Sequence, residues 1–565
     1  MNKFLLLALT FFITGVSTAQ IFSKRTEFTK KDTIRGTLMA NRSCYDVHFY
    51  DLNITVDPDS QFVTGYNDIY FKATQNFEEM QVDLFDFWKI DKIEWFEPNM
   101  AYAGPPVRDV AYERLYHSMF LKMPVPIKEG ELHRVRITYH GVPMVAKRAP
   151  WDGGFVWSED KNGNHHVGVA CQGLGASSWW PNKDHLSDEP DSMYFSVACP
   201  ANLKFVGNGN LMSDEADDSY KPNYHRYNWR VSYPINNYNV SVNIADYKQW
   251  SEVYTSPVDG RKLDMDYYVL PENFEKSKEH FKQVKPMMEC FENLYGPYPF
   301  WNDGYALVET PYLGMEHQGA IAYGNRYLPG YLGQKTAGQE FDYIIIHETG
   351  HEWWGNSISV ADVAELWIHE SFCTYSEAQY VECLYGNDAY MDYLNAKVRG
   401  IANKKPIVGP FGVNQEGADI YNKGAWVLHT TRGIVDNDEL WHDIVYSFAT
   451  DYQRSIVNTQ TFIDLVKAKS GKDISIVYDQ YLNHANPPIL EYKLTKVKKG
   501  YNFEYRWQTD VEGFEMPVKF EVGKKSPGLK TISANNNWQT FFVKKGKIED
   551  FILNDEYFYF VGDQK

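Results

Sequence analysis

The sequence predicts a multidomain protein with a large N-terminal β domain, a mainly α-helical middle domain and a small C-terminal β-sandwich. From about residue 44 to 270, short segments such as VHFYDLNITV and YNDIYFKA alternate apolar and polar residues between turn signals, which is typical of strands. After Pro271 helical spacing dominates, and after Pro487 and Pro488 strand-like segments return. These changes of pattern along the 565 residues predict the three domains.

We place the domains at residues 20–270, 271–486 and 487–565. The middle domain starts with NFEKSKEHFKQVKPMMECFENLYG, whose helical spacing ends at Gly296. Further helical segments are predicted at residues 337–354, 365–385, 418–434 and 460–484.

The first residues, MNKFLLLALTFFITGVSTAQ, predict a secretory signal peptide over residues 1–19. Lys3 supplies the charged start, an apolar run follows, and Ser17-Thr18-Ala19 forms a small-residue cleavage site. A buried N-terminal helix is the alternative, but the order of these three parts fits export better. The apolar run is too short to cross a bilayer, and no later stretch approaches a membrane span. We therefore expect an exported protein, periplasmic or secreted.

Composition excludes some classes of protein. The formal net charge is -18, and removal of residues 1–19 takes away one Lys and no acid, which disfavours a nucleic-acid partner. The six cysteines are dispersed without a CxxC pair, so they predict neither a disulfide scaffold nor a structural zinc site. A bridge between Cys171 and Cys199 stays open.

The segment IIIHETGHEWWGN, residues 344–356, places titratable groups beside apolar ones, which is costly unless those groups are paired or ligated. His347 and His351 are four residues apart, so on a helix they share one face and can bind one metal ion. Glu348 is placed to take a proton from a water on that ion. Two histidines still need a third ligand and an open position for catalysis.

The third ligand is predicted in ELWIHESFCTYSEAQYVECLYG, a second helix after a short connection. Glu370 lies early in that helix, and Glu377, two turns later, can accept the spare N–H of a ligating histidine. We expect Glu352 and Glu365 to be exposed or to support the ligands, and His165-His166 in KNGNHHVG to lie in a solvated turn. The pattern predicts a zinc site with one ion per chain.

At this point the sequence resembles the zinc aminopeptidases of the aminopeptidase N and leukotriene A hydrolase family, which are gluzincin metallopeptidases. The resemblance covers about residues 43–490 and rests on four ordered motifs. They are HETGHEWWGN followed by WIHESF, ETPYLGMEHQGAIAYGN, DIYNKGAWVLHTTR, and ACQGLGASSWWP in the first domain. The resemblance implies a thermolysin-like fold for the catalytic middle domain.

The resemblance also implies a role for each matching residue. The zinc ligands would be His347, His351 and Glu370, with Glu348 as the general base and Tyr421 steadying the oxyanion. Glu316 and Gln172 would hold the free amino group of a peptide, and Gly314 would lie beside the substrate backbone. The expected activity is removal of N-terminal residues from peptides.

This chain departs from the family pattern at three positions. His317 and His369 stand where asparagine is usual, and Ser371 stands where glycine is usual. None of these changes removes a ligand, the base or the amine anchor, so we expect activity to be kept. The changes affect local hydrogen bonding and the preference for the substrate's side chain. We expect His317 to support the site and not to bind the metal.

Three alternatives stay open from the sequence: a non-catalytic peptide-binding relative, an epoxide hydrolase and an endopeptidase. Longer family members carry a large helical domain after the sandwich. Here the strands after Pro487 run to Lys565, so we expect a short bacterial-type form with a more open cleft. Rates should then fall little as peptides lengthen. The oligomeric state is not given by the sequence, and we favour a monomer.

Overall fold

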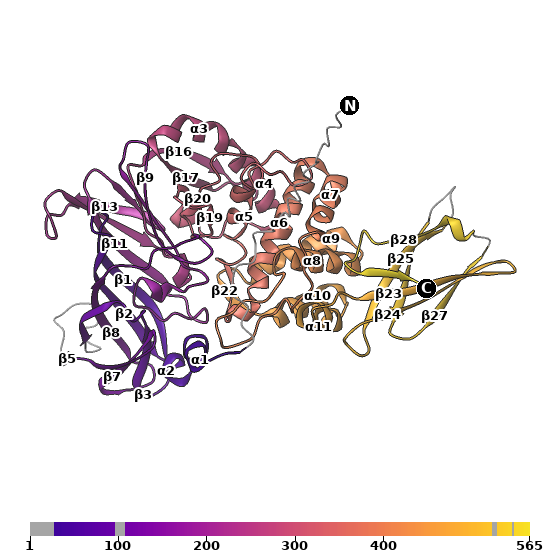
Figure 1. Cartoon of the computed structure of the whole chain (residues 1–565), viewed down its shortest axis with the longest axis horizontal. Coiled ribbons are helices and arrows are strands. Elements are labelled where there is room, and N and C mark those ends of the chain that lie inside the picture. The colour runs from indigo at the N-terminus through magenta and orange to yellow at the C-terminus, as the bar shows by residue number, and fades with distance from the viewer. Residues whose placement is uncertain (1–26, 97–107, 523–527, 545–546) are drawn as a thin grey trace, which may run out of the picture.

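The structure is a computed structural model that describes residues 27–96, 108–522, 528–544 and 547–565. The predicted signal peptide, residues 1–19, lies outside the described residues. In the part of the chain that is described, no helix is long and apolar enough to cross a membrane. A helical region lies between N-terminal sheets and C-terminal sheets (Figure 1), so the predicted fold class is confirmed.

The N-terminal region is built mainly from strands. Its largest sheet has the strand order β13-β14-β11-β1-β2-β8-β4-β5. These strands are β1 (Tyr45–Asp57), β2 (Phe62–Ala73), β4 (Lys89–Phe96), β5 (Arg108–Asp109), β8 (Leu132–Gly141), β11 (Ser192–Pro200), β13 (Asn210–Ala216) and β14 (Tyr224–Val231). Strand β1 pairs antiparallel with β2 and parallel with β11, at the centre of the sheet.

Two smaller sheets complete this region, together with two short helices at its start. The sheets have the orders β3-β7-β6 and β12-β15-β10-β9. Their strands are β3 (Phe77–Asp83), β6 (Ala111–Leu115), β7 (Ser118–Ile127), β9 (Gly154–Glu159), β10 (His165–Ala170), β12 (Lys204–Val206) and β15 (Asn243–Ala245), and the helices are α1 (Lys30–Gly36) and α2 (Ala40–Ser43). The expected solvated turn at His165-His166 is wrong. Both residues belong to β10, and the buried His166 ring contacts the Glu309 carbonyl oxygen at 3.1 Å.

The middle region combines helices with a five-stranded sheet, order β16-β17-β18-β20-β19, whose first two strands precede the boundary expected at residue 271. The strands are β16 (Lys248–Thr255), β17 (Lys262–Val269), β18 (Tyr305–Glu309), β19 (Gly314–Met315) and β20 (Ile321–Tyr323), and β21 (Ile358–Val360) pairs with β22 (Ser455–Val457). The helices are α3 (Phe274–His280), α4 (Val284–Tyr295), α5 (Tyr343–Gly350), α6 (Trp367–Tyr385), α7 (Asn387–Val398), α8 (Asn422–Val435), α9 (Asp438–Asp451), α10 (Thr459–Ser470) and α11 (Ser475–Asn483).

Two of the predicted helical segments differ from the structure. The segment 337–354 is helical only as α5, because Asp342 caps the helix by accepting from the backbone N–H groups of Ile344 and Ile345. The segment 460–484 forms two helices, α10 and α11. Gly471 ends α10 in the left-handed conformation (φ 70°), which glycine adopts without steric cost.

The two tryptophans after the HExxH motif fix α5 against α6. The ring of Trp354 lies 4.7 Å from that of Phe372 on α6, and its indole N–H donates to Ser376 Oγ at 3.1 Å. Trp353 is buried and stacks edge-on against Phe291 of α4. Aromatic pairs of this kind add to the stability gained from burying their surface. The apolar surface around the motif therefore holds the two helices in register.

A disulfide joins Cys290 of α4 to Cys383 near the end of α6. The possible bridge between Cys171 and Cys199 is absent, since both are free and buried. No local pattern predicts the observed pair, whose members are 93 residues apart. The bridge ties the far end of α6 to a neighbouring helix.

Replacing both Cys290 and Cys383 with alanine is expected to lower the free energy of unfolding by ~2–4 kcal/mol, because the bridge restricts the unfolded chain. Urea denaturation of the parent and the variant under oxidising conditions measures this difference. A reducing agent should bring the parent to the variant's midpoint. Equal midpoints under oxidising conditions would contradict the expectation.

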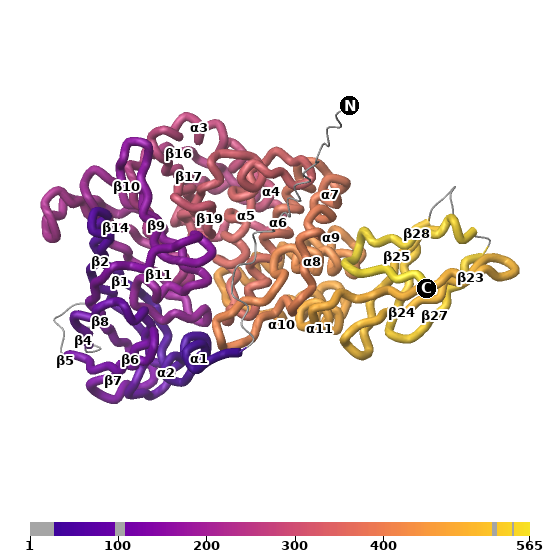
Figure 2. The backbone as a smooth tube through the Cα atoms, in the orientation of Figure 1, coloured from indigo at the N-terminus to yellow at the C-terminus, as the bar shows by residue number. Residues whose placement is uncertain are grey.

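The C-terminal region lies at one end of the molecule (Figure 2). It is a sandwich of two sheets, with orders β27-β24-β23-β29 and β26-β25-β28. Its strands are β23 (Ile489–Val497), β24 (Gly500–Gln508), β25 (Glu515–Val522), β26 (Gly528–Asn535), β27 (Gln539–Lys544), β28 (Phe551–Asn554) and β29 (Val561–Gln564). The ring of Phe503 on one sheet packs 5.1 Å from Phe520 on the other. The sheets thus share an apolar interior.

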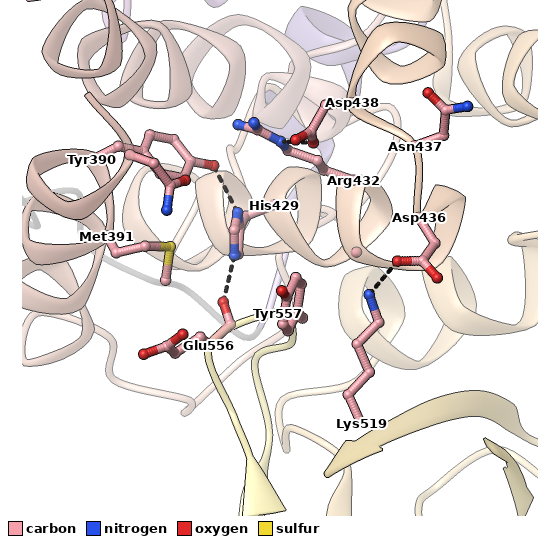
Figure 3. Close-up of a pocket in the computed structure, with 12 residues that line it drawn as sticks. Tyr390, Met391, His429, Arg432, Asp436, Asn437, Asp438, Lys519, Glu556 and Tyr557 are labelled. Carbon is pink, nitrogen blue, oxygen red and sulfur yellow. Dashed lines mark hydrogen bonds and ion pairs between the residues drawn. The ribbon is translucent and has the colours of Figure 1, made fainter. Parts of the chain in front are cut away.

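A polar cavity of about 320 Å³ lies where the sandwich meets α7, α8 and the start of α9 (Figure 3). Its charged groups largely pair with one another. Lys519 of β25 bonds Asp436 at 2.6 Å, and the ring of His429 lies between the Tyr390 hydroxyl at 2.6 Å and the Glu556 carbonyl oxygen at 2.7 Å. These contacts attach the sandwich to α8, the helix that begins next to Tyr421.

Candidate metal centre

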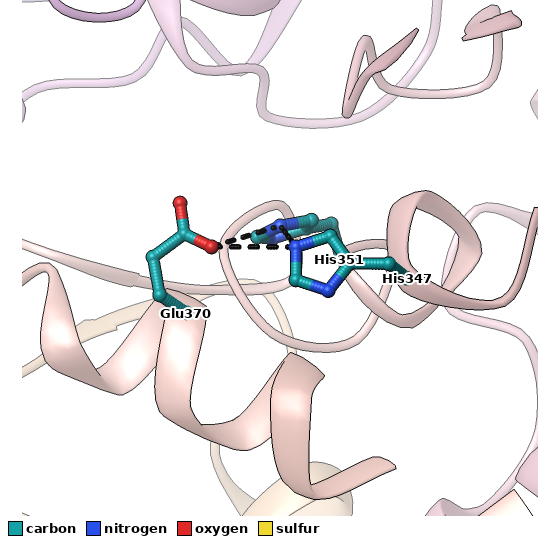
Figure 4. Close-up of side chains that lie close together, drawn as sticks. All are labelled: His347, His351 and Glu370. Atoms are coloured by element: carbon teal, nitrogen blue, oxygen red, sulfur yellow. Dashed lines mark hydrogen bonds and ion pairs between the residues drawn. The ribbon is translucent and has the colours of Figure 1, made fainter. Parts of the chain in front are cut away.

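Helices α5 and α6 bring together the three residues that the sequence predicts as metal ligands (Figure 4). His347 lies in α5, and His351 follows its last residue with helical backbone angles. Glu370 lies in the first turn of α6. The His347 and His351 Nε2 atoms are 3.3 Å apart, and Glu370 Oε2 lies 3.4 and 3.5 Å from them. All three side chains are buried.

This donor set fits a zinc ion. Ligand atoms at tetrahedral angles around zinc, each about 2.0–2.2 Å from it, stand about 3.3–3.5 Å apart. The Nδ1 atom of His347 donates to Glu377 and that of His351 donates to the Trp354 carbonyl oxygen at 2.9 Å, which leaves both Nε2 lone pairs free to bind a metal. Glu370 Oε2 is buried and has no hydrogen-bond partner among the described residues.

The electrostatics of the group also favour a cation. Burial would lower the pKa of His347, but the nearby carboxylates of Glu370 and Glu377 outweigh it and raise that pKa to about 9. Burial would raise the pKa of Glu370, yet His351 and His347 hold it below its usual range. The surroundings therefore stabilise positive charge between the three ligands.

Glu348 lies next to the first ligand, and burial raises the pKa of its carboxyl to about 7. A group with a pKa near the working pH can both accept and deliver a proton. Strand β19 passes close to this carboxylate. A Cβ atom at Gly314 would stand 2.9 Å from Glu348 Oε1 and 2.6 Å from Ile344 Cγ2, so only glycine allows this approach.

Glu377 orients His347 through a hydrogen bond of 2.7 Å to Nδ1. Its other oxygen accepts from the Tyr393 hydroxyl at 2.7 Å and from Lys397 Nζ at 2.5 Å. Tyr393 and Lys397 lie on α7. The sequence did not predict them as residues of the site, because no motif marks them and they meet Glu377 only through helix packing. Both oxygens of the buried Glu377 carboxylate thus have hydrogen-bond partners, and Lys397 offsets its negative charge.

Replacing Glu377 with alanine is expected to weaken zinc binding ~10- to 100-fold, since the variant no longer fixes the His347 ring and tautomer. Competition with a fluorescent zinc chelator measures the dissociation constant. Glu382→Ala is a matched control, because Glu382 lies on the same helix but pairs with Arg432. An unchanged zinc affinity in Glu377→Ala would show that the contact is only structural.

The predicted amine anchor lies beside the ligand group. Glu316 follows β19, and one of its oxygens lies within 4.8 Å of atoms of Glu348 and His351. Gln172, from the loop after β10, donates to Glu316 Oε1 at 2.5 Å. The N-terminal region therefore supplies one member of this pair and the middle region supplies the other.

Tyr421 is the N-cap residue of α8, with φ −84° and ψ −83°. Its ring centroid lies 6.0 Å from that of His347, at an interplanar angle of 28°. The pKa of Tyr421 lies well above its usual range because the partly buried ring has lost solvent around its hydroxyl and because Glu370 is near. The phenol therefore stays protonated and can donate a hydrogen bond.

Glu352 and Glu365 were expected to be exposed or to support the ligands, and the structure excludes exposure. Glu352 is fully buried and does not face solvent; it accepts from the Tyr298 hydroxyl at 2.9 Å and the Gly319 N–H at 3.0 Å. Glu365 is also buried and accepts from the Thr459 N–H at 2.8 Å. Both glutamates connect segments around the site.

The three departures from the family pattern are all fully buried. The ring nitrogens of His317 and His369 have no hydrogen-bond partner among the described residues, and burial lowers the pKa of each to about 3. Both rings are therefore neutral. His317 is not in either cluster of potential metal ligands found among the described residues. Ser371 has a partner, the Ile420 carbonyl oxygen at 2.6 Å.

Comparison with known proteins agrees with this geometry. Residues 279–481 match the Peptidase family M1 domain. Relatives include Tricorn protease-interacting factor F2 of Thermoplasma volcanium, 23% identical over 303 residues, and aminopeptidase A of Gloydius brevicauda, 21% identical over 336 residues. These alignments cover 50% and 53% of this chain but 35% and 33% of those proteins, so the chain spans about a third of their length.

Among solved structures, the M1 zinc metallopeptidase from Deinococcus radiodurans shares the fold, with a TM-score of 0.63 at 18% identity. The alignment covers 78% of this chain and 94% of that one. A mutant of that metallopeptidase was solved with a Tyr-Ser-Ala substrate. These structures support the fold, and the match to the Peptidase family M1 domain together with the aminopeptidase relatives confirms the resemblance seen in the sequence.

Proposed function

Since the chain carries a Peptidase family M1 domain, we propose that it is a zinc-dependent aminopeptidase that removes N-terminal residues from peptides. The observation that carries this proposal is the acidic anchor beside the ligand group. Glu316 lies within 4.8 Å of atoms of Glu348 and His351 and is held by Gln172. A peptide whose α-ammonium pairs with Glu316 can place only its first peptide bond at the metal.

His347, His351 and Glu370 would hold the zinc ion. When bound, zinc supplies Lewis acidity, which polarises the scissile carbonyl and lowers the pKa of water to about 7. Glu348 is the general base and then the general acid. Its carboxylate accepts a proton from the attacking water and later delivers it to the leaving amine. Its raised pKa supports both steps.

The Tyr421 hydroxyl donates a hydrogen bond to the oxygen on which negative charge develops. The place of Tyr421 at the start of α8, next to the His347 ring, supports this role. Such a donor acts chiefly in the transition state, so it raises turnover more than it tightens substrate binding.

Glu316 and Gln172 select substrates with a free amino terminus. Replacing Glu316 with alanine is expected to raise KM for free-amine substrates ~10- to 100-fold, because a charged hydrogen bond to the ammonium is lost. Zinc content should not change, since Glu316 lies outside the ligand set. Steady-state kinetics on a peptide and its N-acetylated form measure the effect. The anchor lies elsewhere if the variant keeps the parent's ratio of free to acetylated cleavage.

A rate panel over aminoacyl fluorogenic amides, with and without a chelator, tests the proposed function. We expect hydrolysis of free-amine substrates, refusal of acetylated ones and loss of activity on chelation. Cleavage of acetylated peptides would instead indicate an endopeptidase. Zinc binding without any turnover would indicate a non-catalytic relative.

We also propose that the protein is exported, periplasmic or secreted. The signal-like N-terminus motivates this proposal, and the disulfide between Cys290 and Cys383 supports it, because disulfides persist mainly in oxidising compartments. Fractionation of the native cells tests it. The proposal fails if the protein stays in the cytosol with residues 1–19 still attached.

A further inference from the structure

Ser371 connects the metal-ligand helix to the residue just before Tyr421. It directly follows Glu370 on α6, and its Oγ donates to the Ile420 carbonyl oxygen at 2.6 Å. Ser371 and Ile420 are both buried. The bond therefore spans the two segments that carry a metal ligand and the predicted oxyanion donor.

This bond acts on the backbone of Tyr421. The Ile420 carbonyl and the Tyr421 N–H belong to one planar peptide unit. A hydrogen bond to the carbonyl oxygen therefore fixes the orientation of the peptide that precedes the Tyr421 Cα atom. Tyr421 has backbone angles outside the helical region and no side-chain cap, while the chain turns sharply at Asp419, with φ +54°. The helical bonds of α8 begin only with the Tyr421 carbonyl, which accepts from Ala425 N–H at 3.0 Å.

The first turn of α8 is shaped around the same hydroxyl. A Cβ atom at Gly424 would stand 1.7 Å from Ser371 Oγ and 2.6 Å from Ser371 Cβ. Gly424 thus allows α8 to approach α6 closely enough for the bond to Ile420. No comparable contact to the α8 start is available to a glycine at position 371, since glycine has no side-chain donor.

We propose that Ser371 is a positioning residue that sets the Tyr421 hydroxyl relative to the metal ligands. The proposal rests on the proposed function, in which Tyr421 donates to the oxyanion. Losing the bond lets the Ile420–Tyr421 peptide rotate, and small misplacements of a catalytic donor reduce turnover strongly. Ser371 acts through Tyr421 and does not itself touch the substrate.

A double-mutant cycle tests this proposal. Ser371→Ala is expected to lower kcat about 10-fold with KM and zinc content unchanged. In a Tyr421→Phe background the same change should have little further effect, because residues that act as a unit are not additive. Ser371→Cys, which keeps a weak donor, should recover part of the loss. Thermal unfolding checks that each variant is folded.

Ser376→Ala is the matched control. Ser376 is a buried serine on the same helix, and its hydroxyl donates to the Phe372 carbonyl oxygen at 2.8 Å and accepts from the Trp354 indole N–H at 3.1 Å, so it makes no bond to the segment that carries Tyr421. It should lower stability without a selective loss of kcat. A Ser371→Ala variant that behaves like Ser376→Ala, or effects of Ser371→Ala and Tyr421→Phe that multiply in full, would overturn the proposal.

A second readout does not depend on turnover. An α-aminophosphonate dipeptide mimic presents tetrahedral oxygens where the oxyanion would form, and calorimetry gives its dissociation constant with the zinc-loaded protein. Ser371→Ala and Tyr421→Phe should weaken binding by non-additive factors. If the parent binds the mimic but hydrolyses nothing, the proposed function fails while this cycle still decides the role of Ser371. If the parent neither binds nor hydrolyses, both proposals are wrong.

Discussion

Replacing Glu348 with glutamine is expected to abolish peptide hydrolysis and to leave zinc bound. The amide keeps the size of the side chain, but it cannot accept a proton from the attacking water. The three ligands are untouched, so the variant should hold the same amount of zinc as the parent. Steady-state rates on a free-amine substrate and metal analysis of the same sample measure both parts of this expectation.

Glu352→Gln is the control for this change. Glu352 is also a buried glutamate of the HExxH segment, with its pKa raised to about 7 by burial, but its oxygens face Tyr298 and Gly319. We expect this variant to keep most of the activity. Substantial turnover in Glu348→Gln, or an equal loss in both variants, would show that Glu348 is not the base.

Replacing Tyr421 with phenylalanine is expected to lower kcat ~100- to 1,000-fold, the usual cost of losing one oxyanion donor. KM should change little, because the hydroxyl acts mainly on the transition state. The ring contact with His347 is kept, so zinc affinity should also be kept. Stopped assays at saturating substrate measure kcat directly.

Tyr343→Phe is the matched control, because the Tyr343 ring also stacks on His347, at 5.4 Å between centroids. Its hydroxyl lies near Glu377 and has no assigned part in the reaction itself, so a smaller effect on kcat is expected. If both variants lose activity equally, the loss reflects packing around His347. If Tyr421→Phe keeps full turnover, the oxyanion donor is another group.

The parts of the site that the sequence predicts are those that follow from local spacing. His347 and His351 lie one helical turn apart, and Glu377 lies two turns after Glu370, so helix geometry alone places each pair on one face. The structure brings these residues together as the spacing indicates.

The parts that could not be predicted depend on packing between distant segments. Lys397 reaches Glu377 across helices, Cys290 meets Cys383 through the packing of α4 on α6, and Ser371 meets Ile420 49 residues away. No local pattern tells which partner each of these residues meets. The break between α10 and α11 did have a sequence signal, Gly471. The prediction missed it because helical spacing continues on both sides of this glycine.

Titration of the metal-free protein with zinc, with the hydrolysis rate of a free-amine aminoacyl amide followed at each addition, tests the central claim most directly. The account predicts no activity without metal and a linear rise that ends at about one zinc per chain, because one open three-ligand site supports the reaction. Full activity in the metal-free protein, or no activity at any zinc content, would contradict it.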